Sequence, residues 1–126
     1  MPKKVQVTLT GNESKRLIAK AAVLHPEVRG RLDSGHKLLL AGGTTVSALA
    51  EELGFGPMRI SGRIDAEGTR SAQTITQTPH NLLIQNGQAV NADKNIQAIV
   101  EGLSSADLIV TGANAIDPSG RAALAF

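Results

Sequence analysis

Residues 36–45 read HKLLLAGGTT, and this segment indicates the architecture of the chain more directly than any other. The apolar run from Leu38 to Ala41 is typical of a strand buried on both faces, as strands of parallel sheets are. Two glycines follow, and beyond them apolar residues recur at the spacing of a helix that Gly54 would cap. The segment therefore predicts a strand, a tight glycine loop and a helix in direct succession.

Further elements are expected before this segment. Residues 5–9 alternate apolar and polar side chains, which predicts a short strand. Thr10 and Glu13 stand at the spacing of a capping box, so a helix should begin there and carry its apolar stripe to Leu24. Residues 26–32 begin with a proline, and they predict a second short helix that ends near Gly35.

The pattern after the glycine loop and its helix is less regular. Residues 59–78 are rich in Ser, Thr, Gly and Arg, and they predict short strands or a hairpin. Residues 81–85 predict another strand, and Asn86-Gly87 after it is a good turn signal. Helical spacing over residues 92–103 predicts a helix, and residues 107–110 predict a buried strand.

Strands that alternate with helices are typical of βαβ units. The expected fold is therefore α/β, with a mostly parallel sheet flanked by helices in a Rossmann-like three-layer sandwich. The length of 126 residues corresponds to a single α/β domain over residues 1–126. Residues 121–126 are apolar and rich in alanine, without a stop signal. We therefore expect the fold to be incomplete, either as the N-terminal part of a larger domain or until a partner chain, such as a second copy in a homo-oligomer, covers this end.

Composition excludes several classes of function. The chain has no cysteine, which excludes disulfides and thiolate metal sites, and its three histidines lack metal-ligand spacing, so neither a metal nor a cofactor is expected. The basic N-terminus is followed by no apolar run of the length of a signal peptide or a membrane span, so a cytoplasmic protein without membrane contact is expected. Aromatic residues make up only 2%, which argues against single-stranded nucleic-acid binding.

The charge is spread unevenly along the chain. Residues 1–37 contain eight Lys and Arg against three Asp and Glu, a net charge of +5. Such a basic segment favours anionic ligands, or it forms a solvated helix face. An interaction module for RNA or an acidic protein is therefore kept as an alternative, although the scarcity of aromatic residues argues against nucleic acid as a partner.

The glycine loop has a clear chemical use. Gly42 and Gly43 allow several backbone N–H groups to turn the same way, Thr44 and Thr45 add hydroxyls, and the next helix adds the positive end of its dipole. This combination suits a phosphate or a carboxylate, although the loop lacks the lysine of a Walker A motif. We expect Gly43 to require a positive φ. The alternative is a tight turn in which Thr44 only caps the helix.

A second candidate loop follows the last predicted strand and contains Gly112, Ala113, Asn114 and Asp117. Parallel strands would bring this loop beside the glycine loop, at the carboxyl edge where such sheets bind ligands. Asn114 is suited to a sugar hydroxyl and Asp117 to a base, but both are also ordinary turn residues. Arg63 is a candidate clamp for the anion, with a mixed-charge surface loop as the alternative.

Two segments, LLLAGGTT at 38–45 and DLIVTGANAID at 107–117, resemble motifs of one superfamily. It contains ribose-5-phosphate isomerase, glucosamine-6-phosphate isomerase, the CoA transferases and the sugar-effector domains of DeoR-type repressors. The first segment resembles the family's phosphate loop, and the second resembles the acidic strand end of the isomerases. The resemblance covers most of residues 12–117 and implies a sugar phosphate or a CoA ester as ligand.

The departures from the isomerase pattern shape the predicted function. Acidic residues of that pattern are replaced here by Thr111, Asn114 and Ala115, and its lysine- and glutamate-bearing glycine loop does not follow. Proton abstraction from a sugar needs a carboxylate near the substrate carbon, and Asp117 is the nearest one. We therefore predict binding of a small phosphorylated or carboxylated metabolite. The alternative is a divergent isomerase or CoA/acyl transferase fragment that requires additional chain and uses Asp117 in catalysis.

Overall fold

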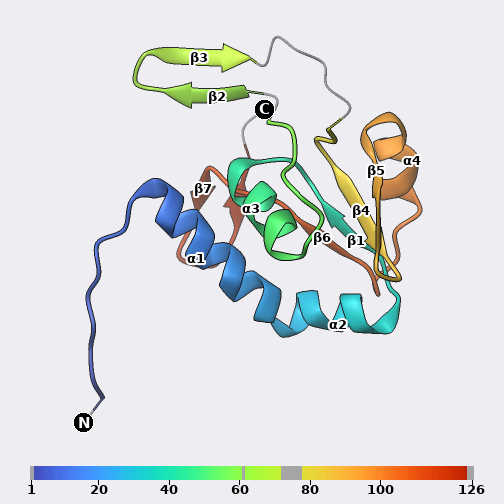
Figure 1. Cartoon of the computed structure of the whole chain (residues 1–126), viewed down its shortest axis with the longest axis horizontal. Helices are drawn as coiled ribbons and strands as arrows, with labels where there is room; N and C mark the ends of the chain where they lie inside the picture. The colour runs from blue at the N-terminus through green and yellow to red at the C-terminus, as the bar shows by residue number, and fades with distance from the viewer. Residues whose placement is uncertain (1, 61, 72–77, 125–126) are drawn as a thin grey trace.

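A four-stranded sheet lies at the centre of the structure (Figure 1), and its strands follow the order β5 (Gln88–Asn91), β4 (Leu82–Gln85), β1 (Leu38–Leu40) and β6 (Leu108–Val110). The computed structural model describes residues 2–60, 62–71 and 78–124, and within 62–71 it describes the side chains of residues 66–68. The fold is mixed α/β, which confirms the predicted class.

The sheet is mixed, so the expectation of a mostly parallel sheet is wrong. β1 runs parallel to β6, but β1 and β4 are antiparallel, as are β4 and β5. The Asn86-Gly87 turn accounts for the second of these antiparallel pairs, because both of its residues have positive φ, 52° and 74°. Such a two-residue turn forms a hairpin, and a hairpin imposes an antiparallel pair of strands. The general alternation of strands and helices does not predict this hairpin.

Two helices precede the sheet as predicted, α1 (Gly11–Leu24) and α2 (Pro26–Ser34). The capping box at the start of α1 is formed: the backbone N–H of Glu13 donates to Thr10 Oγ1, and the N–H of Thr10 donates to the Glu13 carboxylate. Gly35 ends α2 in the left-handed conformation, at φ 75°. Local capping chemistry therefore defines both helices.

The core lies between the sheet and the helices α1 and α3 (Thr44–Glu52). Because side chains alternate along a strand, Leu38 and Leu40 face the same side, where they pack with aliphatic residues of the helices. The buried residues of this cluster include Ala19, Val28, Val46, Leu49, Ala50, Leu82 and Ile84. This packing fixes α3, and with it the glycine loop that precedes it.

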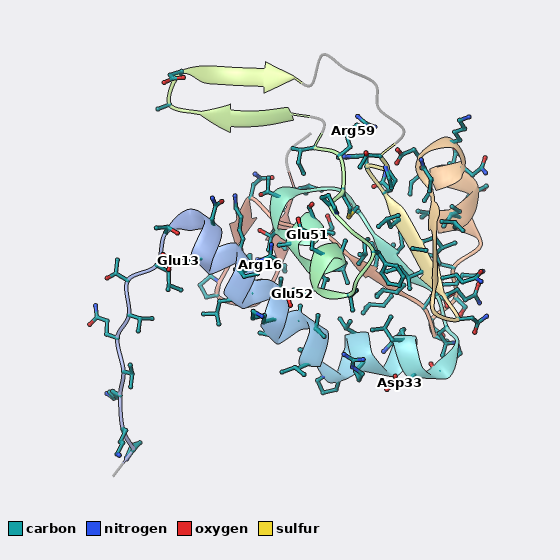
Figure 2. All side chains as sticks on the ribbon, in the orientation of Figure 1. Glu13, Arg16, Asp33, Glu51, Glu52 and Arg59 are labelled. Carbon is teal, nitrogen blue, oxygen red and sulfur yellow. The ribbon has the colours of Figure 1, made fainter. Side chains whose placement is uncertain are left out.

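Ion pairs join α1 to α3 at the surface. The guanidinium of Arg16 lies 2.9 Å from a Glu51 carboxylate oxygen and 3.1 Å from one of Glu52 (Figure 2), and Lys20 lies 3.5 Å from the other oxygen of Glu52. Exposed pairs of this kind contribute little stability, about 0–1 kcal/mol each. They orient two helices that apolar packing holds together.

The predicted strand over residues 5–9 is wrong. These residues are extended but belong to no sheet of the described structure, and Val5 and Val7 are 85% and 66% exposed. An alternating pattern describes how a segment would pair, but it supplies no partner strand. Residues 2–9, here called the N-terminal arm, lead away from the rest of the chain (Figure 1).

The remaining elements are short. A hairpin of β2 (Gly62–Asp65) and β3 (Gly68–Ser71) confirms the prediction for this region, although residues 72–77 lie outside the described structure. The helix predicted over 92–103 is a 3-10 turn at Asp93–Asn95 followed by α4 (Ile96–Glu101). β7 (Ala115–Ile116) and β8 (Ala122–Ala123) form a second small hairpin. In the described ranges, no helix has the length and apolarity needed to cross a membrane.

The β4–β5 hairpin provides a test of this core. Ile84 is 1% exposed and Val90 is 54% exposed on the paired strand. We predict that Ile84→Ala lowers the free energy of unfolding by roughly 2–5 kcal/mol, because removing most of a buried aliphatic side chain leaves a cavity. Val90→Ala should change it by less than about 0.5 kcal/mol. Urea denaturation measures both values, and equal losses for the two variants would contradict the placement of the core.

Candidate functional site

Two loops predicted to carry function lie side by side at the carboxyl edge of the sheet. Leu40 of β1 is in register with Val110 of β6, and the N–H of Ala41 donates to the Val110 carbonyl at 2.9 Å. Because the strands are parallel, the chain leaves both at the same edge. Both loops line one small hollow of about 110 Å³, to which Thr45 contributes from the first and Thr111 and Gly112 from the second.

The two glycines of the first loop have different roles. A Cβ at Gly42 would lie 2.2–2.5 Å from three ring atoms of His80, so only glycine allows the imidazole to approach this closely. Gly43 has φ 163° and ψ 160°, an extended conformation open to any residue, and a Cβ there would meet no described atom within 4 Å. Gly43 therefore does not adopt the left-handed φ that favours glycine, and the expectation that it does is wrong. The steric requirement for glycine acts at Gly42 instead.

The first turn of α3 presents free hydrogen-bond donors. Gly43 is the N-cap, and the N–H of Ser47 already donates to its carbonyl. Among the described residues, no acceptor meets the backbone N–H groups of Thr44, Thr45 and Val46, and no side chain caps the helix. The alternative role of Thr44 as a side-chain cap is thus not seen. The first turn also carries no acidic residue, so the positive end of the helix dipole is not neutralised there.

A hydrogen-bonded cluster holds the glycine loop from the side of the β4–β5 hairpin. Asn81 Oδ1 accepts from the N–H of Gly42 at 3.1 Å, and Asn81 Nδ2 donates to Asp93 Oδ1 at 3.2 Å. The same Asp93 carboxylate accepts from the backbone N–H groups of His80 at 2.9 Å and Asn81 at 2.7 Å. His80 Nδ1 lies 2.8 Å from the Arg59 carbonyl. These bonds fix the His80 ring beside Gly42.

The Asp93 carboxylate is stabilised in its ionised form. Partial burial would raise its pKa, but hydrogen bonds from the backbone of His80 and Asn81 and from the Asn81 amide outweigh that effect. The Arg59 guanidinium, 3.6 Å from Asp93 Oδ2, adds a favourable charge. The net result is an Asp93 pKa below its ordinary value, so this carboxylate stays charged at neutral pH.

Sequence patterns did not single out Asn81 or Asp93, and they left His80 among the residues without a metal-ligand pattern. The available signal was the Asn86-Gly87 turn. It pairs Leu82 with Asn91, and so it brings the residues just outside each end of the hairpin together. Pairing the predicted strand over residues 81–85 with the residues after this turn would have placed Asn81 opposite Ala92, next to Asp93.

The second loop is exposed, and its polar residues take part in the β7–β8 hairpin. Gly112, Ala113 and Asn114 are exposed, and the N–H of Asn114 donates to the Ala123 carbonyl at 2.8 Å. In the turn between β7 and β8, Asp117 accepts bonds from Ser119 and from Arg121, whose Nε lies 2.7 Å away.

These bonds bear on the proposed chemistry of Asp117. Hydrogen bonds from the Ser119 hydroxyl and from the Arg121 backbone and side chain lower the Asp117 pKa below its ordinary value. A carboxylate held ionised in this way is a weak base. Arg63, the other predicted site residue, lies in β2 opposite Arg70, and its side chain is outside the described part of the structure.

Comparison of the chain with protein-family models, curated proteins and solved structures gives no match. The resemblance to the sugar-phosphate isomerase and CoA-transferase superfamily therefore stays a prediction based on its two motifs. In the described part of the chain, no group of three or more His, Asp or Glu side chains is arranged to hold a metal ion.

The contact between Gly42 and His80 can be tested by a double-mutant cycle. We predict that Gly42→Ala lowers the free energy of unfolding by about 1–3 kcal/mol, because the added methyl group displaces the ring. The same substitution should cost less in a His80→Ala background, with a coupling of roughly 0.5–3 kcal/mol. Gly43→Ala is the matched control and should leave stability within about 1 kcal/mol. Additive effects in the cycle would show that the ring does not press on Gly42.

The low pKa of Asp93 predicts a pH dependence of stability. A carboxylate whose pKa is lower in the folded state stabilises the fold above its unfolded pKa, and this contribution is lost as the pH falls through the folded pKa. The stability difference between the wild type and Asp93→Asn should therefore be largest near neutral pH and shrink below about pH 4. Urea denaturation at a series of pH values measures it.

The control for this series is Asp33→Asn. Asp33 is exposed on α2 and makes no hydrogen bond or ion pair with the residues that the structure describes (Figure 2). Its stability difference should be small, because the substitution removes none of these interactions. A difference for Asp93→Asn that does not shrink at low pH would contradict the stabilising role of the Asp93 carboxylate.

Proposed function

We propose that this chain binds a small anionic metabolite, phosphorylated or carboxylated, at the glycine–threonine loop. The observation that carries the proposal is the open first turn of α3, where the N–H groups of Thr44, Thr45 and Val46 meet no acceptor among the described residues. Helix N-termini with free N–H groups bind anions through these donors and through the helix dipole. The Thr44 and Thr45 hydroxyls are further donors to the same group.

The position of the loop supports this proposal. Ligands of α/β sheets bind beyond the carboxyl ends of the strands, and the loop lies at that edge between β1 and β6. The neighbouring loop would supply a second set of contacts to the ligand, from Gly112, Ala113 and Asn114. The Rossmann-like three-layer sandwich and the superfamily resemblance remain part of this proposal, since both imply a phosphate loop at this place.

The expected affinity follows from the number of contacts. Hydrogen bonds to a charged group contribute about 1.5–3 kcal/mol each, and ordering the ligand offsets part of the sum. Two or three such bonds from backbone N–H and hydroxyl donors alone correspond to a dissociation constant near 1 mM, about −4 kcal/mol. Further contacts to the remainder of the metabolite would add to this value, so the natural ligand should bind more tightly than inorganic phosphate.

Binding without catalysis is the simpler form of the proposal. The nearest predicted base, Asp117, is engaged by Ser119 and Arg121, and its pKa is lowered. An isomerase needs a base whose pKa is close to the working pH. The enzyme hypothesis therefore depends on residues from additional chain.

The test is a thermal-shift screen of the wild type and Thr44→Asp against inorganic phosphate, sugar phosphates, sugar acids, nucleotides and CoA esters. Bound ligand raises the melting temperature by mass action. The introduced carboxylate should leave the ligand-free melting temperature unchanged or higher, because an anion at a helix N-terminus is favourable, while it abolishes the ligand-induced shift by repulsion.

Asn12→Asp is the matched control, since it adds the same charge to the first turn of α1. This variant should keep the full ligand-induced shift. No shift of the wild type with any of these compounds would overturn the proposal. An equal shift in the wild type and in Thr44→Asp would move the anion away from α3.

A further inference from the structure

One side of the β6 backbone has no strand beside it in residues 2–60, 62–71 and 78–124. Within these ranges β6 is the last strand of the sheet and its one partner is β1: the N–H of Leu108 donates to the Lys37 carbonyl, and the Val110 carbonyl accepts from Ala41. Because bonding alternates along a strand, the N–H and carbonyl of Ile109 point away from β1. The Ile109 side chain is 44% exposed. An open edge with an exposed apolar residue is a template for another strand.

The N-terminal arm has the pattern of a strand but no partner strand in the described structure. Residues 3–9 read KKVQVTL, a strand pattern with apolar residues at every second position, and they are extended without a strand partner in the described structure. Val5, Val7 and Leu9 are 85%, 66% and 39% exposed. Their burial would stabilise a paired state, since a fully buried valine or leucine side chain contributes about 1.5–3 kcal/mol.

The surface beside the β6 edge is also apolar. Ile18 of α1 is 51% exposed and lines the hollow of about 110 Å³ together with Ala22, Leu49 and Val110. Four water molecules occupy about this volume, so the hollow has room for one aliphatic side chain. Aliphatic side chains form most of its lining, with Thr45 and Thr111 beside them, so the hollow suits an apolar side chain better than an anion.

We propose that the N-terminal arm of a second copy of this chain pairs with β6 as a fifth strand and places an apolar side chain in this hollow. The same exchange in the other direction gives a symmetric dimer with two identical contacts. The arm contributes backbone hydrogen bonds to Ile109 and apolar contacts to Ile18. The inference does not rest on the proposed anion binding, although Thr45 belongs to the glycine loop and also lines this hollow.

The direction of the arm favours a second copy over the arm of the same chain. The capping box between Thr10 and Glu13 fixes how the chain enters α1. From that point the arm leads away from its own sheet (Figure 1). Folding back to its own β6 would require a sharp turn beside the capping box, whereas a second copy can meet the arm in its present direction.

The charges of the chain also permit this contact. The arm carries Lys3 and Lys4, and without them the chain has 13 − 2 = 11 Lys and Arg against 11 Asp and Glu. The body that receives a basic arm therefore has no net positive charge to repel it. The arm adds to a neutral surface, and the dimer as a whole has the modest positive charge of its two chains.

The test is the oligomeric state of the full chain, measured by sedimentation equilibrium over a wide range of protein concentration. The wild type should form a dimer that dissociates on dilution. Val7→Pro removes one N–H from an exposed arm and should weaken dimerisation by roughly tenfold or more without changing the monomer fold. Ile109→Lys should weaken it similarly, because charged side chains protect sheet edges.

Val90→Lys is the matched control, since Val90 is 54% exposed on the opposite edge strand β5. This variant should dimerise like the wild type. In hydrogen exchange, the Ile109 amide should be protected in the wild-type dimer and unprotected in Val7→Pro. A wild type that stays monomeric, or a dimer lost in Val90→Lys but kept in Val7→Pro and Ile109→Lys, would overturn the proposal. A monomer whose Ile109 amide is protected until Val7→Pro is introduced would also overturn it, because its own arm would then cover the edge.

Discussion

A hydrogen bond from the backbone N–H of Gly42 to Asn81 Oδ1 ties the glycine loop to the β4–β5 hairpin. Asn81 is itself held by the ionised Asp93, which also accepts the backbone N–H of His80. The His80 ring then lies where a Cβ at Gly42 would be. The start of α3 therefore depends on the carboxylate of Asp93, two positions after the end of β5, and the loop geometry follows from that anchoring.

The anchoring explains why the site can present free donors. With the loop held by Asn81, the first turn of α3 needs no side-chain cap, and its N–H groups remain open toward the carboxyl edge of the sheet. The parallel pairing of β1 with β6 brings Thr111 and Gly112 to the same edge. The pairing of β1 with β4 thus places Asn81 beside the glycine loop, and the pairing of β1 with β6 places the second loop there.

Local signals in the sequence predicted most elements, and long-range contacts were the part that it left open. The capping box at Thr10, the strand at Leu38–Leu40 and the Asn86-Gly87 turn are each encoded within a few residues. The strand expected at residues 5–9 failed because pairing depends on a partner that no local pattern specifies. The Asn81–Asp93 contact was missed for a similar reason, since it depends on the register of a hairpin.

The most direct test of anion binding at α3 is a titration of the isotope-labelled chain with sulfate, followed residue by residue through the backbone amide resonances. Sulfate keeps its charge near neutral pH, so a saturable change in an amide resonance reports binding and not titration of the anion. We expect saturable shifts that are largest at Gly43, Thr44, Thr45 and Val46, with smaller ones at Thr111 and Gly112. Shifts centred on another part of the chain, or none at these residues at high sulfate concentration, would contradict it.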